Sequence, residues 1–389
     1  IHLNDLEPLI ATPSSPGNVV PVKEVAGRSI SQVVVGSSAN PGLRDFWMVS
    51  EIINGKSVPP EVSLDINPSS RQKIEDLGKL GALNLLIQAG ARYHQTGCMG
   101  CIGMGQAPAS NTISLRTMPR NFPGRSGTAD DNVYLCSPET AAVSALNGKI
   151  TNPQDFAQTM KYPQFKEPEK ASVNRIMLIP PRADTSDVEL KKGPNIKSLP
   201  DFEKIENSFS VPVVLKLGDN ISTDEILKAG AEVLPLRSNI EAISKYTYYV
   251  VSKDFYDNAK KAREEHGGHI VVAGENYAQG SSREHAAVAP RYLGQKAVIA
   301  KSYARIGFQN LVNYGIIPFI FQHPKDYDEI KSEDILEVKS VLQAIQNDTP
   351  TLAVNQSTQK GIAVECHLTQ QQKKILLAGG LINYLKQKK

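Results

Sequence analysis

Apolar and polar positions along the first 162 residues fall into patterns that predict strands and helices in alternation. The stretch SQVVVGSSANPG, residues 31–42, is a β-branched run closed by Gly-Ser-Ser, which is typical of a buried strand followed by a turn. In RQKIEDLGKLGALNLLIQAGARY, residues 71–93, apolar residues recur at helical spacing, and Gly90 suits the C-terminal cap. The alternation predicts an α/β domain over residues 1–162.

The pattern changes in the next segment of the chain. Residues 163–210 are polar and rich in proline, and a segment that can bury so little predicts a linker, with one short strand at RIMLIP, residues 175–180. From Val211 onward, strand, turn and helix patterns resume, as in HIVVAGENYAQGSSREHAA. They predict a second, smaller α/β domain over residues 211–389, which ends in a strand-rich segment and a C-terminal helix at residues 369–389.

Length and composition narrow the class of protein. A chain of 389 residues is too long for one ordinary core, so two domains are expected. The net charge of +3 is too small to argue for a nucleic-acid or membrane partner. Four cysteines are too few for a disulfide scaffold and fit a reducing compartment. No run of about 18 apolar residues and no leader pattern is present, so the expected location is the cytoplasm, with an organelle matrix as the alternative.

A pair of cysteines, Cys98 and Cys101, lies in the glycine-rich stretch TGCMGCIGMGQ. The absence of Cβ atoms at the glycines would let the backbone wrap closely around a metal or a cluster. A zinc site would need a second cysteine pair or a histidine pair, and His94 is the only histidine nearby. A thioredoxin-like redox pair would need a strand-to-helix junction. Spacing alone therefore leaves the cluster, redox and metal interpretations open.

Two further segments are candidate anion sites. In GSSREH, Ser281 and Glu284 have the spacing of a capping box, which is a purely structural interpretation. The functional alternative is that the free amides of a helix N-terminus, two hydroxyls and Arg283 bind a carboxylate. In RNFPGRSG, Arg120 and Arg125 flank a Pro-Gly turn, and both guanidinium groups could face one cavity. The alternative for these two arginines is that both are surface charges.

Taken together, the motifs resemble the aconitase family, iron–sulfur hydro-lyases that interconvert hydroxy-tricarboxylates by dehydration and rehydration. The matching stretches are GCMGCIG, RNFPGRSGTAD, LCSPETAA, DNISTDEILKAG and ENYAQGSSREHAA, and the match covers essentially the whole chain. The resemblance implies a three-layer α/β domain like the third aconitase domain (1–162), a linker (163–210) and a smaller swivel domain of the β/β/α type (211–389). It also implies that the chain is the C-terminal half of such an enzyme, or one subunit of a split enzyme, whose partner carries the first two domains.

The resemblance assigns roles by position in the motifs. Cys98 and Cys101 match two of the three cysteines that hold the family's [4Fe-4S] cluster, whose open iron binds substrate as a Lewis acid. Ser281 matches the serine that acts as the catalytic base. A serine hydroxyl is a very weak acid, so dense positive charge is needed around it. The other residues that match catalytic positions are Arg283 and Asp224, and those that match substrate-binding positions are Arg120, Arg125, Arg237 and Ser282.

Two residues depart from the family pattern. Ser38, in GSSANPG, stands where the family has its third cluster cysteine, and a serine oxygen is a poorer iron ligand than a thiolate. Pro119 replaces the asparagine that begins the family's N-R-N-F turn. Cys136 and Cys366 are expected to be buried structural cysteines. Both departures fall next to the cluster position, whereas the carboxylate-binding arginines are retained.

These features lead to one main hypothesis of function and two alternatives. The main hypothesis is an aconitase-like hydratase acting on a hydroxy di- or tricarboxylic acid, such as citrate or isocitrate through cis-aconitate. One alternative is a non-catalytic paralogue without a cluster that binds anions or RNA as a regulator, although the near-neutral charge does not favour RNA. The other is a hydratase with a different metal centre on the same scaffold.

Overall fold

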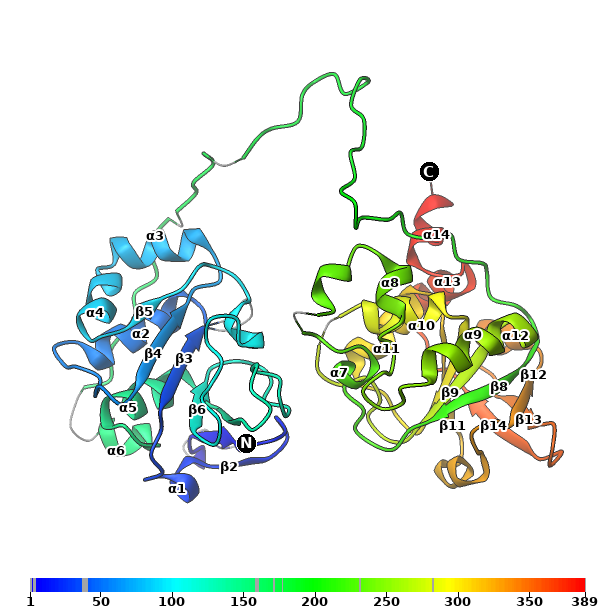
Figure 1. The fold of residues 1–389 in the computed structure, drawn as a ribbon, viewed down its shortest axis with the longest axis horizontal. Coiled ribbons are helices and arrows are strands. Elements are labelled where there is room, and N and C mark those ends of the chain that lie inside the picture. The colour runs from blue at the N-terminus through cyan, green and yellow to red at the C-terminus, as the bar shows by residue number, and fades with distance from the viewer. Residues whose placement is uncertain are drawn as a thin grey trace. The chain divides into compact units, whose positions relative to one another are not determined.

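The computed structural model describes residues 2, 5–36, 41–157, 161–170, 172–176, 178–230, 232–281 and 283–388. The chain divides into two compact units, Ile1–Asp187 and Val188–Lys389 (Figure 1). The division falls inside the segment that the sequence predicts as a linker. In the described part of the chain, no helix is both long and apolar enough to span a membrane.

Unit 1 is built on a seven-stranded sheet that is parallel in its centre and antiparallel at one edge. The predicted buried strand in residues 31–42 is confirmed as β3, an interior strand between β6 and β4, and all five of its residues are buried. The strands in sheet order are β2 (Val19–Pro21), β1 (Leu9–Ala11), β7 (Asn132–Leu135), β6 (Ile113–Arg116), β3 (Gln32–Gly36), β4 (Ser63–Asn67) and β5 (Arg92–Tyr93).

The helices of unit 1 pack into one apolar core on one face of this sheet (Figure 1). The helical pattern in residues 71–93 forms two helices rather than one, because Gly81 has a positive φ of 75°, which a helix interior does not accept. Gly90 follows the second of these helices with a φ of 99°, the left-handed conformation expected after a helix end. The helices are α1 (Val22–Val25), α2 (Leu43–Ile53), α3 (Arg71–Lys79), α4 (Ala82–Gln88), α5 (Pro138–Asn147), α6 (Pro153–Ala157) and the 3₁₀ turn η2 (Gly100–Ile102).

The two faces of the sheet differ in chemistry because successive side chains of a strand point to opposite faces. The face toward the helices carries valine, isoleucine and leucine from β3, β4 and β6. The opposite face carries Gln32, Asp65, Ser114 and Arg116, all buried, and is covered by the segment that contains η2. The sheet thus lies between a helical layer and a layer of mostly irregular chain. The α/β class predicted from the sequence is confirmed.

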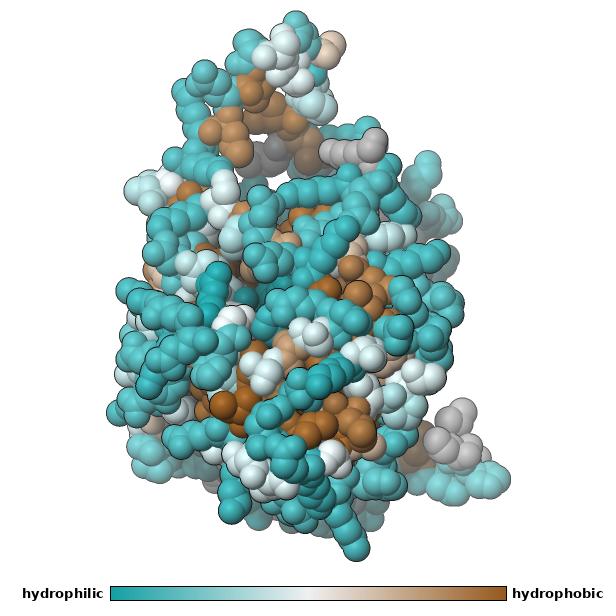
Figure 2. Space-filling view, turned by 90° about the vertical axis from the view of Figure 1, so that its right-hand side faces the viewer, coloured by the Kyte–Doolittle hydropathy of each residue, from teal (hydrophilic) through white to brown (hydrophobic). Residues whose placement is uncertain are grey.

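The linker segment contains no strand among the described residues of 175–180, so the short strand predicted at RIMLIP is wrong. An extended segment needs a neighbouring strand to pair its backbone groups, and these residues have none. Their side chains also remain in solvent: Ile176 is 85% exposed and Ile179 is 94% exposed. Figure 2 shows a mostly hydrophilic surface with apolar residues on the segment that projects at the top.

Unit 2 is a closed seven-stranded barrel with mixed strand directions, and helices pack around it. Its interior is filled mainly by valine, isoleucine, phenylalanine and leucine. The strands in barrel order are β10 (Gln295–Ala300), β11 (Ile317–Phe321), β14 (Gly361–Glu365), β13 (Thr351–Asn355), β12 (Ile335–Val338), β8 (Phe209–Lys216) and β9 (His269–Ala273).

The single C-terminal helix predicted from residue 369 is wrong, because the chain forms two helices that Gly379 and Gly380 separate. Both glycines have a positive φ, of 85° and 124°, and therefore break the helix. The helices of unit 2 are α7 (Thr223–Ile226), α8 (Ile240–Ser244), α9 (Phe255–His266), α10 (His285–Tyr292), α11 (Arg305–Asn313), α12 (Val341–Asn347), α13 (Gln370–Leu377) and α14 (Leu381–Lys386), with 3₁₀ turns η3 (Leu234–Leu236) and η4 (Pro324–Glu329).

Candidate functional site

Two of the cysteines of unit 1, Cys98 and Cys101, lie on a tight loop over the polar face of the sheet. Cys98 is exposed, whereas Cys101 is buried in η2 and packs against Val34 and Met118. The loop leaves little room beside two of its glycines. At Gly103, which has a φ of 76°, a Cβ atom would lie 1.9 Å from the backbone carbonyl oxygen of Ser126. A Cβ atom at Gly100 would lie 1.8 Å from the side-chain oxygen of Gln106, far inside van der Waals contact. The loop geometry therefore explains part of the glycine-rich sequence.

Both arginines of the RNFPGRSG turn lie close enough to act on the buried thiol. Arg125 Nη2 donates to Cys101 Sγ at 3.4 Å. The hydrogen bond with Cys98 and burial raise the pKa of Cys101, and the charges of Arg125 and Arg120 oppose that rise. The two guanidinium groups and the two thiols therefore lie in the same part of unit 1.

A network of buried polar residues lies under this loop, and sequence reasoning did not identify it. The side chain of Asp65 is fully buried, with its Oδ1 atom 2.9 Å from His94 Nε2 and 3.0 Å from Arg92 Nη2. Arg116 is also fully buried and donates to the carbonyl oxygen of Gly100 at 2.8 Å. The only sequence signal is that polar residues occupy alternate positions in otherwise apolar strands.

The residues around the thiols fit an iron–sulfur cluster only in part. Cys98 and Cys101 would supply two ligands, and the buried amide of Gln106 finds no hydrogen-bond partner within the described residues. However, the described part of the chain contains no group of three or more His, Cys, Asp or Glu side chains that could hold a metal ion. Ser38 lies outside the described residues. Two thiols are fewer ligands than a [4Fe-4S] cluster requires, so the described residues do not complete such a site.

The other two cysteines do not join the pair. Cys136 precedes α5 and packs against the helical core, and burial raises its pKa to about 12. Cys366 follows β14 in unit 2, and burial raises its pKa as well. A buried thiol that stays protonated is chemically inert. Both residues have the surroundings of structural cysteines.

In unit 2, the GSSREH segment does not form the capping box suggested by its sequence. Helix α10 begins only at His285, and the backbone N–H of Ser281 donates to Thr223 Oγ1 at 3.0 Å instead. The carboxylate of Glu284 is hydrogen-bonded to Tyr314. The same S-x-x-E pattern does form a capping box at Ser222, which begins α7. The segment is therefore held by contacts with α7 rather than by its own helix.

Arg283 and Asp224 lie together beside half-buried Ser281. Arg283 Nη2 lies 3.0 Å from Asp224 Oδ1, and Arg283 Nη1 donates to the carbonyl oxygens of Thr223, at 3.2 Å, and Leu227. The guanidinium group is thus fixed by α7 and the residue that follows it. Ser282 lies outside the described residues.

Arg237 belongs to a neighbouring loop. Its side chain is exposed, and its carbonyl oxygen lies 2.9 Å from His285 Nε2, which joins the loop to the start of α10. The structure therefore places the backbone of Arg237 against the GSSREH segment.

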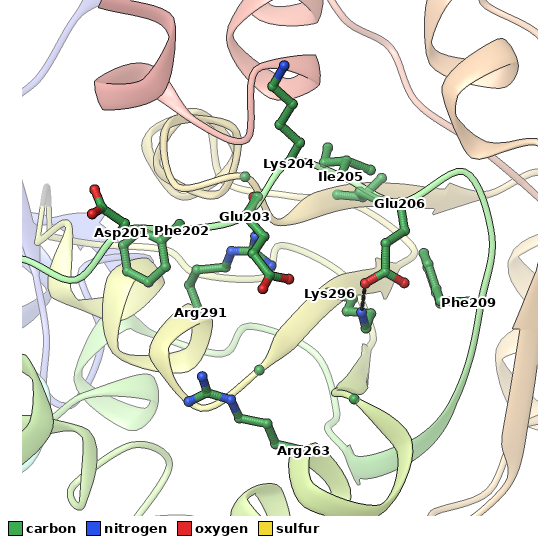
Figure 3. A pocket seen from close by; sticks show the side chains of 14 residues that line it. Asp201, Phe202, Glu203, Lys204, Ile205, Glu206, Phe209, Arg263, Arg291 and Lys296 are labelled. Atoms are coloured by element: carbon green, nitrogen blue, oxygen red, sulfur yellow. Dashed lines mark hydrogen bonds and ion pairs between the residues drawn. The ribbon is translucent and has the colours of Figure 1, made fainter. Parts of the chain in front are cut away.

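A cavity of about 310 Å³ in unit 2 lies under the end of the linker (Figure 3). None of the predicted site residues lines it. Lys296 forms a 2.6 Å ion pair with Glu206, and Arg291 donates to the carbonyl oxygen of Glu203 at 2.8 Å. These contacts attach residues 201–206, at the end of the linker segment, to the rest of unit 2. The cavity therefore lies where the linker is anchored.

The fold and the clustered residues define a two-unit α/β protein with paired thiols among arginines in one unit and a serine beside an arginine–aspartate pair in the other. The chain belongs to the aconitase family. Residues 23–148 match the family model described as "Aconitase family (aconitate hydratase)", and residues 224–324 match that of the aconitase C-terminal domain.

Several known proteins are similar to parts or most of the chain. Mitochondrial homocitrate dehydratase and mitochondrial aconitate hydratase, both from Saccharomyces cerevisiae, are 28% identical over 90% and 91% of this chain and over 51% and 52% of their own lengths. The large subunit 1 of 3-isopropylmalate dehydratase from Methanopyrus kandleri is 42% identical over 40% of this chain and 38% of its own. A solved 3-isopropylmalate dehydratase from Methanocaldococcus jannaschii matches 46% of this chain and 95% of its own at 33% identity, with a TM-score of 0.38. The chain spans about half the length of the two yeast relatives.

Proposed function

We propose that this protein is an aconitase-type hydro-lyase that acts on a hydroxy di- or tricarboxylic acid, such as citrate or isocitrate through cis-aconitate. The observation that carries the proposal is the gathering of Arg120 and Arg125 at the Cys98–Cys101 loop. Guanidinium groups bind carboxylates in two places at once, and a substrate with several carboxylates needs more than one such group.

In unit 1, the proposed role of Arg120 and Arg125 is to bind substrate carboxylates. Arg125 also donates to Cys101 Sγ, so a carboxylate bound there would lie next to the thiol loop. The two thiols would be ligands of a [4Fe-4S] cluster, which supplies Lewis-acid chemistry to hydro-lyases when it is bound. In this chain the described residues supply two of its ligands only.

In unit 2, the proposed role of Ser281 is to accept the proton that a hydro-lyase removes from the carbon adjacent to the one that carries the leaving hydroxyl group. A serine oxygen can hold negative charge only beside fixed positive charge. Arg283 is the nearby cation, and its ion pair with Asp224 and its two bonds to backbone carbonyls keep it in place. Arg237 is a further proposed carboxylate ligand, and Ser282 is proposed by position alone.

We further propose that the family's first two domains, in the same chain or as a separate subunit, complete the enzyme. This chain spans about half of its yeast relatives, and the Methanopyrus relative is itself named a large subunit. The enzyme should therefore be purified with whatever polypeptide accompanies it in its native source. Activity of the 389-residue chain alone would contradict this part of the proposal.

The experiment is an anaerobic purification followed by iron and sulfide analysis and an assay of unsaturated product from citrate, isocitrate, homocitrate and 3-isopropylmalate. We expect Arg125→Lys to lower kcat/KM about a hundredfold, because the point charge of lysine cannot replace the planar fork of arginine. Arg44→Lys, an exposed arginine of the same unit, serves as the control and should leave kcat/KM unchanged. An iron-free protein that stays inactive after reconstitution would overturn the proposal and favour a non-catalytic anion- or RNA-binding paralogue.

A further inference from the structure

Arg116, in the middle of unit 1, is an unusual residue for its position. It ends the central strand β6, its exposed fraction is 0%, and its side chain points toward the polar face of the sheet. A buried guanidinium loses its hydration, and a well-packed apolar side chain of similar volume would avoid that cost. Its presence therefore calls for hydrogen bonds that no apolar residue could provide.

Those hydrogen bonds go to the cysteine loop. Arg116 Nη1 donates to the carbonyl oxygen of Gly100 at 2.8 Å, and Nη2 donates to the carbonyl oxygen of Gln106 at 2.5 Å. Gly100 lies between Cys98 and Cys101, and Gln106 ends the loop. The planar fork of one arginine thus holds the loop at its centre and at its end.

The fork is itself held from the sheet side. Its Nε atom donates to Ser114 Oγ at 3.1 Å, and Nη2 also donates to Gln32 Oε1 at 3.0 Å. The amide nitrogen of Gln32 donates in turn to Asp65 Oδ2 at 3.2 Å. Asp65 holds His94, where the cysteine segment begins. The buried side chains therefore form one connected network that fixes the segment at its start, centre and end.

We propose that Arg116 is a positioning residue for the thiol pair, which holds Cys98 and Cys101 in a fixed arrangement by binding the carbonyl groups of their loop. The inference rests on the proposed function in one respect, namely that the thiols serve as metal ligands. A ligand loop that is fixed before the metal arrives loses little conformational freedom on binding. Arg116 itself touches no reacting atom and is not a catalytic residue.

The test measures how fast each cysteine of the full chain reacts with iodoacetamide, followed peptide by peptide with mass spectrometry. In the unaltered protein, Cys98 should react fast because it is exposed. Cys101 should react slowly because it is buried, and Cys136, which is partly buried against the helical core, should react at a rate between the two. Arg116→Met removes both bonds to the loop, and we expect the labelling of Cys101 to become about tenfold faster or more, because the loop opens locally. Arg116→Lys should restore part of the protection, since it can bind one carbonyl group.

Cys136 is the internal control for general unfolding. Its backbone N–H donates to the carbonyl oxygen of Arg116 at 3.0 Å, while its side chain packs on the helical face. Its labelling rate therefore reports whether strand β6 and the helical core survive the substitution. A second control is Ser144→Ala, an equally buried residue on α5 that accepts a hydrogen bond from Thr151 and does not touch the loop. It should leave the labelling of Cys101 unchanged.

A milder variant guards against failure of Arg116→Met to fold. Gln32→Leu keeps the arginine and removes its support, and we expect Cys101 labelling to become about threefold faster. Equal acceleration at Cys101 and Cys136 in both variants, or no acceleration at Cys101 in either, would overturn the inference.

A separate measurement isolates the metal role. The unaltered protein should show thiolate-to-metal charge transfer when titrated with Co²⁺ without oxygen, and Arg116→Met should weaken Co²⁺ binding about tenfold. The inference is supported if Arg116→Met binds Co²⁺ more weakly while Ser144→Ala keeps the Co²⁺ affinity of the unaltered protein. If the unaltered protein shows no charge transfer, the ligand role in the proposed function fails, and the labelling rates still decide whether Arg116 positions the loop.

Discussion

The guanidinium group of Arg283 and the carboxylate of Asp224 form an ion pair of 3.0 Å that is largely shielded from water, with side-chain exposures of 13% and 19%. The pair connects the segment before α10 to helix α7, which lie 59 residues apart in sequence. Asp224 Oδ1 also accepts a hydrogen bond from the backbone of Ala229 at 3.3 Å. The position of Arg283 thus depends on a helix of only four residues.

Removal of the Asp224 carboxylate should therefore destabilise unit 2. We expect Asp224→Ala to lower the free energy of unfolding by about 2 kcal/mol, because Arg283 is left without its charge partner in a poorly hydrated place. Urea denaturation measures the change. Glu241→Gln, which breaks an ion pair with Lys197 on the surface, is the control and should leave the midpoint in place. Equal effects of the two variants would contradict the structural importance of the Arg283 pair.

Acid should destabilise unit 2 through His269. His269 is fully buried at the start of β9, and this burial lowers the pKa of its side chain from 6.5 to about 3. Between pH 6.5 and pH 3 the unfolded chain binds a proton that the folded chain does not bind, so stability is lost as pH falls. The loss should reach about 1.4 kcal/mol per pH unit.

The measurement for His269 is urea denaturation across this pH range. His269→Gln cannot titrate and should flatten the pH dependence. His367→Gln changes an exposed histidine, at 70% side-chain exposure, and should keep the slope of the unaltered protein. An unchanged slope in His269→Gln would show that other groups cause the acid sensitivity.

The cysteine loop should not tolerate a methyl group at Gly103. This residue has a φ of 76°, and a Cβ atom there would meet the backbone carbonyl oxygen of Ser126 at 1.9 Å, so Gly103→Ala should destabilise unit 1 by about 1–3 kcal/mol. Gly78 provides the matched control, since it lies in α3 with no atom within 4 Å of the added Cβ. Gly78→Ala should stabilise the helix by about 0.5–1 kcal/mol. Thermal unfolding compares the two, and shifts of the same sign would refute the packing argument.

The anchor of the linker end should control proteolysis. Arg291→Met removes the hydrogen bond to the Glu203 carbonyl, so residues 201–206 should leave unit 2 more often, and trypsin should cleave after Lys204 several times faster. Lys191 and Lys192 lie in the exposed linker and provide the reference, because their cleavage should not change. If cleavage at all three lysines rises together, the anchor has no local effect.

Much of the architecture could be predicted from the sequence because it depends on local patterns. The strand at β3 follows from a β-branched run, and the change from patterned to proline-rich sequence marks the linker. The breaks at Gly81 and Gly379 could have been predicted as well, since glycine inside a helical pattern is a known signal. The absence of a strand at residues 175–180 could not be predicted from the local sequence pattern, because a strand forms only where a second strand pairs with its backbone.

In the candidate site, too, contacts between residues far apart in sequence could not be predicted from local patterns. Cysteine and arginine motifs are continuous in sequence and were found, whereas Arg116 has no motif. Its partner Gln32 lies 84 residues away, and its other partners are backbone carbonyl groups. Ser222 and Ser281 both begin an S-x-x-E stretch, and of these two only Ser222 forms the capping box. At Ser281 the capping box does not form, because Ser281 and Glu284 make hydrogen bonds to Thr223 and Tyr314 instead.

The contrast between the two faces of the sheet in unit 1 has a consequence for how the chain selects its strand pairing. A shift of β6 by one residue would turn Arg116 into the helical core and Leu115 toward the cysteine loop. The guanidinium group would then lie among valines and leucines without hydrogen-bond acceptors, and the free energy of this arrangement would be much higher than that of the native register. The side chain of Arg116, which holds the cysteine loop, therefore also destabilises any sheet in which β6 is shifted by one residue. Uniqueness of the fold in unit 1 is thus enforced by one charge that is acceptable in a single register.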